Sequence, residues 1–230
     1  MKIEIWSDVM CPFCYIGKKN FENALAQLPF KDEIKVEWKS YQLDPDLSDS
    51  SENKTVNQYL MERKGMPMAQ IEQMQQRVKE MGEQVGIQFN QEKAIVANTF
   101  LAHKLIHLAT ENNLATEAEE LLFQSHFLNG ENISNLSVLL SIAEQLNLDR
   151  KKVETVLNSD QLDYEVKQDI LEARNIGVSG VPFFVLNDKY AVSGAQPSDI
   201  FIEALTQTYN ETGKISKTNT GDSCSIDSCE

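Results

Sequence analysis

The sequence predicts an α/β protein in which a strand–helix–strand unit leads into a large all-helical insertion, followed by two strands and a last helix. Three observations support this order. Alternating segments flank one amphipathic helix near the start, the middle shows only helical spacing, and alternation returns after residue 177. We therefore expect one domain formed by residues 1–44 and 176–211, an insertion over 45–175 and a tail over 212–230.

The first unit begins with a strand over residues 2–6, where Lys-Ile-Glu-Ile-Trp alternates polar and apolar side chains. A helix follows from about Cys11 to Leu28, with apolar residues four and three positions apart. Pro29 ends this helix because proline cannot continue an α-helical backbone. Residues 34–41 alternate again and predict the second strand.

The predicted insertion follows a polar, turn-rich linker over residues 44–54. Beyond it every periodic segment has helical spacing; the segment 67–85, for example, places five apolar residues three and four positions apart. The predicted helices of this block cover residues 67–85, 98–111, 114–128, 135–147, 149–158 and 160–175.

The closing part of the chain predicts a hairpin and a helix. After a loop over residues 177–182, residues 183–186 are apolar and predict a buried strand. A turn at Asn187 and Asp188 leads to the partner strand over 190–193.

The last predicted helix starts at Pro197, where the missing N–H of proline is not needed for a helical hydrogen bond. We expect this helix to reach about Tyr209, with Ile200, Ile202 and Leu205 facing inward.

Composition and charge exclude several classes of function. The 230-residue chain carries 35 acidic and 21 basic side chains, a net charge of −14, which disfavours nucleic acids and anionic membranes as partners. No segment is apolar enough to span a bilayer, and the N-terminus lacks a secretory pattern. We therefore expect a cytoplasmic protein, in a compartment that keeps thiols reduced.

The four cysteines form two close pairs, Cys11 with Cys14 and Cys224 with Cys229. At a helix start, the unpaired N–H groups and the helix dipole favour an anion, so Cys11 is expected to react as a thiolate. Cys14 is near enough to form a disulfide with it. A zinc site would need four ligands, and the second pair is more than two hundred residues away.

This arrangement predicts thiol–disulfide exchange. Cys11 would attack or be attacked, Cys14 would resolve the mixed disulfide, and the dipeptide Pro12-Phe13 would tune the redox balance. A proline that cannot donate to a sheet fits the strand start at Pro182; the residues leave open whether its peptide bond is cis or an ordinary trans bond.

One further pattern has a simple interpretation. His103, His107 and Glu111 lie four residues apart on one helical face, a spacing that can bind a metal. Since no other ligand pattern accompanies them, we expect a solvated or hydrogen-bonded face and no metal site.

Taken together, the element order and three motifs resemble the DsbA-like thioredoxin-fold family over about residues 1–210. The motifs are Trp-Ser-Asp-Val-Met-Cys-Pro-Phe-Cys-Tyr-Ile-Gly at 6–17, Gly-Val-Ser-Gly-Val-Pro-Phe-Phe at 177–184 and Gly-Ala-Gln-Pro at 194–197. The first is similar to the cytoplasmic FrnE-type branch, which is related to 2-hydroxychromene-2-carboxylate isomerase and kappa-class glutathione transferase.

The resemblance implies a thioredoxin-like fold, with βαβ and ββα halves around the helical insertion. It also implies that the Val181-Pro182 bond is cis, that this bond packs against Cys11, and that the Val181 backbone pairs with bound substrate. Some members of the branch carry a second Cys-x4-Cys, which Cys224 and Cys229 match as a possible second redox pair.

We therefore expect a thiol–disulfide oxidoreductase or isomerase that acts on protein or small-molecule disulfides. Its redox disulfide needs no other cofactor, and glutathione or thioredoxin are candidate electron partners. One alternative is a glutathione-dependent isomerase or transferase of the kappa-like branch, although a serine usually stands there in place of Cys11. Another is a chaperone or adaptor that binds unfolded chains. The sequence does not predict the oligomeric state.

Overall fold

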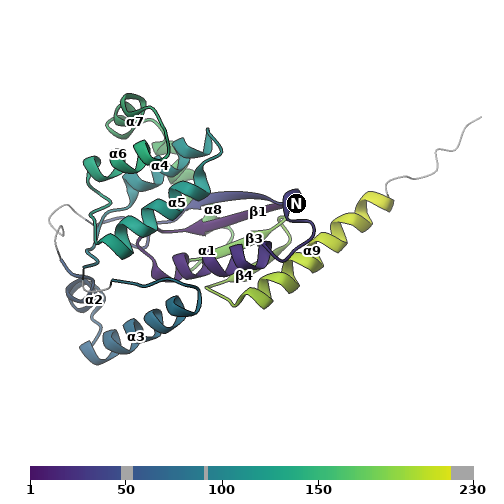
Figure 1. Cartoon of the computed structure of the whole chain (residues 1–230), viewed down its shortest axis with the longest axis horizontal. Helices are drawn as coiled ribbons and strands as arrows, with labels where there is room; N and C mark the ends of the chain where they lie inside the picture. The colour runs from purple at the N-terminus through teal and green to yellow at the C-terminus, as the bar shows by residue number, and fades with distance from the viewer. Residues whose placement is uncertain (48–53, 91–92, 219–230) are drawn as a thin grey trace, which may run out of the picture.

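The computed structural model describes residues 1–47, 54–90 and 93–218. Its sheet has four strands in the order β2-β1-β3-β4. Strands β1 and β2 are parallel, whereas β1–β3 and β3–β4 are antiparallel. The strands are β1 (Lys2–Ser7), β2 (Lys35–Ser40), β3 (Phe183–Leu186) and β4 (Tyr190–Ser193). Strands from the two ends of the chain thus share one sheet (Figure 1).

The two faces of the sheet are covered by different helices. Ile3 and Ile5 of β1 lie on the face that packs against α1 (Pro12–Leu25) and α9 (Ser198–Thr218). Trp6, one residue along the alternation, lies on the opposite face, in a cluster with Ala173 of α8 (Asp163–Asn175). The period of two in β1 therefore decides which helix each side chain meets.

The insertion supplies the remaining helices. Figure 1 shows α4 to α7 gathered beside one end of the sheet, with α2 and α3 in a separate pair below them. Buried residues of both parts, such as Ile5 and Leu139, belong to the same hydrophobic core. The bounds are α2 (Val56–Lys64), α3 (Met68–Gln84), α4 (Phe100–Thr110), α5 (Ala115–Gln124), α6 (Leu136–Gln145) and α7 (Arg150–Leu157).

The structure confirms the predicted fold class and corrects details of it. The predicted helix over 114–128 is α-helical to Gln124 and then continues as a π-helical segment, η3 (Ser125–Asn129). Helix α9 runs past the predicted end to Thr218, so its last turns occupy part of the expected tail. The inward orientation predicted for Ile200 is wrong: it is 44% exposed, and the neighbouring Phe201 is fully buried.

Helix α2 lies within the block for which only helical periodicity was predicted, and its ends are marked in the sequence. Thr55 and Gln58 form a capping box at its start, and Gly65 closes it in the left-handed conformation with φ of 64°. No helix of the described residues is both long and apolar enough to cross a membrane.

Candidate functional site

The first cysteine pair lies where strand β1 leads into helix α1. Cys11 is the N-cap residue and Pro12 occupies the first helical position, as the sequence predicted. The Cys14 N–H donates to Cys11 O at 3.0 Å, which closes the first turn. Both thiols are free, and Cys11 and Cys14 are only 5% and 1% exposed. Both sulfurs therefore lie at the helix N-terminus and are almost completely shielded from water.

The loop before β3, which is distant from the pair in sequence, covers the two cysteines. The Val181-Pro182 peptide bond is cis, and Cys11 Sγ donates a hydrogen bond to Val181 O at 3.6 Å. Both observations confirm what the resemblance implied. A Cβ on Gly17 would lie 2.8 Å from Pro182 Cγ, so only glycine lets the loop approach α1 this closely.

The environment of Cys14 favours the protonated thiol. Burial is the main cause that raises the pKa of Cys14 well above its usual value, and the adjacent Cys11 raises it further. The Asp8 backbone N–H and the Ser7 hydroxyl face the sulfur and act in the opposite direction. Cys14 is thus the sulfur that must lose a proton before it can react.

We call four buried polar residues the buried polar cluster: Ser7, Asp8, Glu119 and His126. Ser7 and Asp8 face the Cys14 sulfur, whereas Glu119 and His126 interact with the charge of Asp8. Asp8 accepts hydrogen bonds from the backbone N–H groups of Leu43 at 2.7 Å and Met10 at 3.3 Å. By contrast, Ser7 Oγ, Glu119 Oε2 and both ring nitrogens of His126 have no hydrogen-bond partner of ordinary geometry among the described residues.

Burial is the main cause of the pKa shifts of Glu119 and His126, the two residues of the cluster that belong to the insertion. It raises the pKa of Glu119 to about 8, with Asp8 adding to the effect and Lys18 opposing it. It also lowers the pKa of His126 to about 4, with Asp8 opposing. At neutral pH the fully buried imidazole is therefore neutral and most of the Glu119 carboxyl is protonated.

The next residue of α5, Glu120, faces a different environment. Lys18 Nζ and Lys19 Nζ lie 2.6 Å and 2.9 Å from its carboxylate, and the Tyr15 hydroxyl donates to it at 2.8 Å. Burial alone would raise the pKa of Glu120, but these hydrogen bonds outweigh it and lower the pKa to about 2. Glu120 thus ties α1 to the insertion beside the cysteine pair.

A cleft of about 700 Å³ opens next to the pair, between α1, α3 and the loops around β4. Phe13 and Val181 border it on the side of the cysteines, and Ser198 at the start of α9 borders it on another. Arg77 is the one formally charged residue among the described residues that line it. The cleft thus has the size of a small-molecule site and a positive group.

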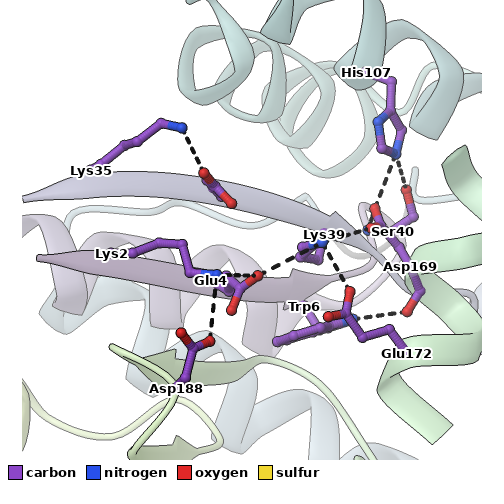
Figure 2. A network of polar contacts seen from close by, with 11 residues as sticks. Lys2, Glu4, Trp6, Lys35, Lys39, Ser40, His107, Asp169, Glu172 and Asp188 are labelled. Atoms are coloured by element: carbon purple, nitrogen blue, oxygen red, sulfur yellow. Dashed lines mark hydrogen bonds and ion pairs between the residues drawn. The ribbon is translucent and has the colours of Figure 1, made fainter. Parts of the chain in front are cut away.

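A second polar network lies on the sheet face opposite α1 and is centred on Asp169 of α8 (Figure 2). The Asp169 carboxylate accepts from the Ser40 backbone N–H at 2.9 Å and from Lys39 Nζ at 3.1 Å. His107 Nε2 is 3.1 Å from both Asp169 Oδ2 and Ser40 Oγ. Because one nitrogen makes both contacts, this group is not a relay of the serine–histidine–aspartate type.

The histidines predicted to form a hydrogen-bonded face do so separately. His103 Nε2 lies 2.9 Å from Tyr41 O and 3.7 Å from Asp8 Oδ1, whereas His107 belongs to the Asp169 network. Glu111 pairs with Lys152. The described residues contain no group of three or more histidine, cysteine or acidic side chains that could hold a metal ion.

The structure thus brings Cys11, Cys14, Val181 and Pro182 together. Cys224 and Cys229 lie outside the described residues, so their role stays a prediction. Sequence reasoning missed the buried polar cluster. A signal was present, since Glu119 sits three residues before Leu122 on the inward side of a predicted helix.

Known proteins match the chain over most of its length. A family model described as DSBA-like thioredoxin domain matches residues 2–206. The uncharacterized protein YwbO of Bacillus subtilis is 27% identical over 208 residues, which cover 89% of this chain and 95% of YwbO.

Several solved structures share the fold, and two of them illustrate the range of identity. The probable DsbA oxidoreductase SCO1869 from Streptomyces coelicolor is 34% identical, with a TM-score of 0.86 over 92% of this chain and 91% of that one. A 2-hydroxychromene-2-carboxylate isomerase is 15% identical, with a TM-score of 0.66 over 96% and 98% of the two chains, a likeness in fold alone.

Proposed function

Because the chain belongs to the DsbA-like thioredoxin domain family, we propose that it is a thiol–disulfide oxidoreductase that works through Cys11 and Cys14. One observation carries the proposal: two free thiols share the N-terminus of α1, and the Cys11 sulfur contacts Val181 O in the cis-proline loop. The unpaired N–H groups at a helix N-terminus favour an anion beside them, which suits Cys11 as the attacking sulfur once its hydrogen bond to Val181 O is released, and burial raises the pKa of Cys14.

The proposed reaction follows from this difference between the two sulfurs. Cys11 attacks a substrate disulfide, one substrate sulfur leaves as a thiolate, and Cys11 becomes joined to the other in a mixed disulfide. Cys14 then loses its proton and attacks Cys11, which releases the second substrate sulfur and forms the Cys11–Cys14 disulfide. The same steps in reverse would oxidise a dithiol substrate.

The neighbouring residues have supporting roles in this proposal. Val181 would pair through its backbone with an extended substrate segment, and Pro182 would hold that segment beside Cys11. Pro12 and Phe13 would tune the potential from the first turn. The substrates would be protein or small-molecule disulfides in the cytoplasm, with glutathione or thioredoxin as electron partner; an isomerase activity and a redox role for Cys224 and Cys229 belong to the same proposal.

The test compares Cys11→Ser and Cys14→Ser in insulin reduction and in oxidation of a dithiol peptide. We expect Cys11→Ser to abolish both activities. Cys14→Ser should instead accumulate a mixed disulfide with substrate, detectable as an added mass that dithiothreitol removes. A Cys224→Ser/Cys229→Ser variant is the control for the tail. Full activity in Cys11→Ser would rule out the proposal.

The cleft beside the pair favours one alternative, a glutathione-dependent isomerase or transferase. Arg77 could bind a carboxylate there, and Phe13 and Val181 border the position that a thiol would take. Such an enzyme does not require the second sulfur. Glutathione binding combined with isomerase or transferase activity that survives Cys14→Ala would favour this alternative, whereas loss of all turnover in Cys14→Ala would favour disulfide exchange.

A further inference from the structure

The cleft beside the cysteine pair contains an arginine that has no acidic partner. Arg77 of α3 is exposed and borders this cleft of about 700 Å³. Among the described residues its side chain makes no hydrogen bond or ion pair, whereas Arg63 and Arg150 each pair with an acidic side chain. The chain carries 35 acidic side chains against 21 basic ones, so a shortage of acidic residues does not explain why Arg77 is unpaired.

The other polar groups along the cleft are neutral. Four amide side chains border it: Asn20 and Asn23 of α1, Gln84 of α3 and Gln196 in the loop before α9. No acidic side chain is among the described residues that line it. Amide side chains both donate and accept hydrogen bonds, as the backbone of an extended peptide does. The cleft therefore combines groups that suit a peptide backbone with a single positive charge.

The length of the cleft fits a polypeptide segment. Phe13 borders it in the first turn of α1 and Asn23 borders it ten residues later, which is about 15 Å along the helix axis. An extended chain advances about 3.3 Å per residue, so about four to five residues span this length. Val181, whose carbonyl oxygen accepts from Cys11 Sγ, borders the same cleft. A segment bound there would pass beside the reactive sulfur.

Resting on the proposed redox function, we propose that Arg77 is a specificity-determining residue, which selects acidic polypeptide segments by binding a carboxylate while a substrate disulfide lies at Cys11. A guanidinium can hold a carboxylate through two parallel, charge-assisted hydrogen bonds. Because α3 belongs to the insertion, the insertion would supply this selectivity to the chemistry of the cysteine pair.

The local charge, and not the net charge of the chain, decides the preference. A basic segment would suit the net charge of −14 at long range, but inside the cleft it would meet Arg77 and no carboxylate of the described residues. Salt at physiological concentration screens exposed charges beyond about 8 Å. An acidic side chain that lies in the cleft therefore interacts mainly with Arg77.

The experiment compares disulfide-linked dimers of a short peptide with one cysteine, in which the neighbouring positions carry either glutamate or glutamine. Mass spectrometry gives the rate constant of their reduction by the reduced full chain. We expect the glutamate-to-glutamine ratio of rate constants to be about fivefold higher in the wild type than in Arg77→Gln. Chemical differences between the peptides themselves cancel in this comparison, because both proteins react with the same two dimers.

Two further variants separate the carboxylate contact from a general change of charge. Lys79→Gln is the matched control, since it removes the same charge two residues along α3 at a different cavity and should keep the wild-type ratio. Arg77→Lys keeps the charge without the paired hydrogen bonds and should keep only part of the ratio. A wild type without preference for glutamate, or a preference that survives Arg77→Gln, overturns the proposal.

A binding measurement separates this proposal from the proposed function. The Cys11→Ser/Cys14→Ser variant cannot exchange disulfides, and fluorescence anisotropy gives its affinity for labelled glutamate and glutamine peptides in which serine replaces the cysteine. We expect tighter binding of the glutamate peptide, weakened by salt and lost when Arg77→Gln is added. If no disulfide is exchanged by the wild type, the proposed function fails, and this binding preference still decides the role of Arg77. Arg77-dependent reduction of oxidised glutathione without a preference between the peptides overturns the polypeptide proposal and favours a small-molecule site.

Discussion

Two groups of buried polar residues flank the sheet, and they differ in how well they are paired. Around Asp169, backbone, lysine and histidine donors all meet one carboxylate, and its pKa is lowered: burial acts to raise it, but His107, Ser40 and Lys39 outweigh that effect. In the buried polar cluster beneath Cys14, Glu119 and His126 lack such partners. The Asp169 group joins strand β1 to helix α8 through the hydrogen bond from Trp6 Nε1 to Asp169 O, whereas Ser7 and Asp8 of the second group face the Cys14 sulfur.

The difference separates polar residues that hold the fold from polar residues that are poised to change charge. A paired carboxylate keeps one protonation state over the whole physiological range. An unpaired one near neutral pKa can change state in response to a nearby charge. The comparison therefore makes opposite predictions for stability and for chemistry in the two groups.

The largest expected effect is on stability, at Asp169. Replacing Asp169 with Asn leaves Lys39 and His107 without their buried anion, and we expect a loss of about 3 kcal/mol in the free energy of unfolding. Urea denaturation measures this loss. The reduction potential of the cysteine pair should not move; a shifted potential with unchanged stability would reverse the assignment of the two groups.

The next effect is the acid sensitivity due to His126. Since its folded pKa is about 4, below the ordinary 6.5, the unfolded chain binds a proton that the folded chain does not. Stability should fall by about 3 kcal/mol as the pH drops from 6.5 to 4. His126→Leu should remove this part of the pH dependence and lose no stability at pH 7. A Leu variant with the wild-type acid profile would contradict the prediction.

A smaller effect is expected at Glu120, the paired neighbour of Glu119. Its lowered pKa of about 2 means that its ion pairs stabilise the fold above pH 4.5 and that this contribution is lost as the pH falls toward 2. Glu120→Gln should cost about 1 kcal/mol at pH 7, after allowance for solvent screening, and little at pH 2. Thermal denaturation of the wild type and the variant at both pH values measures their difference in stability, which should be smaller at pH 2 than at pH 7.

The smallest stability effect is expected at Ser7, whose hydroxyl has no partner of ordinary geometry. Ser7→Ala should change the free energy of unfolding by no more than about 0.5 kcal/mol. The pKa of Cys14 should nevertheless rise further, because the Ser7 hydroxyl lowers it. The pH dependence of Cys14 alkylation in a Cys11→Ser background reports this rise, and an unchanged profile would place Ser7 outside the site.

Much of the fold could be predicted because periodicity reports local structure directly. The strands over 2–6, 183–186 and 190–193 match β1, β3 and β4 within a residue at each end. The boundary at Gln124 could not be predicted, since a π-helical turn is selected by what packs around it and not by spacing. In the same way, Phe201 rather than Ile200 turned inward because Phe21 and Phe184 receive it.

The sequence by itself determined where the first cysteine pair of this protein lies. Cys11 and Cys14 are the first and last residues of a four-residue segment at one helix start, so local geometry places both sulfurs, and the motif at 177–184 identified the loop that covers them. Only the tertiary structure decided which distant residues join Asp8 in the buried polar cluster. Glu119 and His126 are more than a hundred residues away in the chain, and their burial and pKa values arise from a core that forms only when the insertion packs on α1.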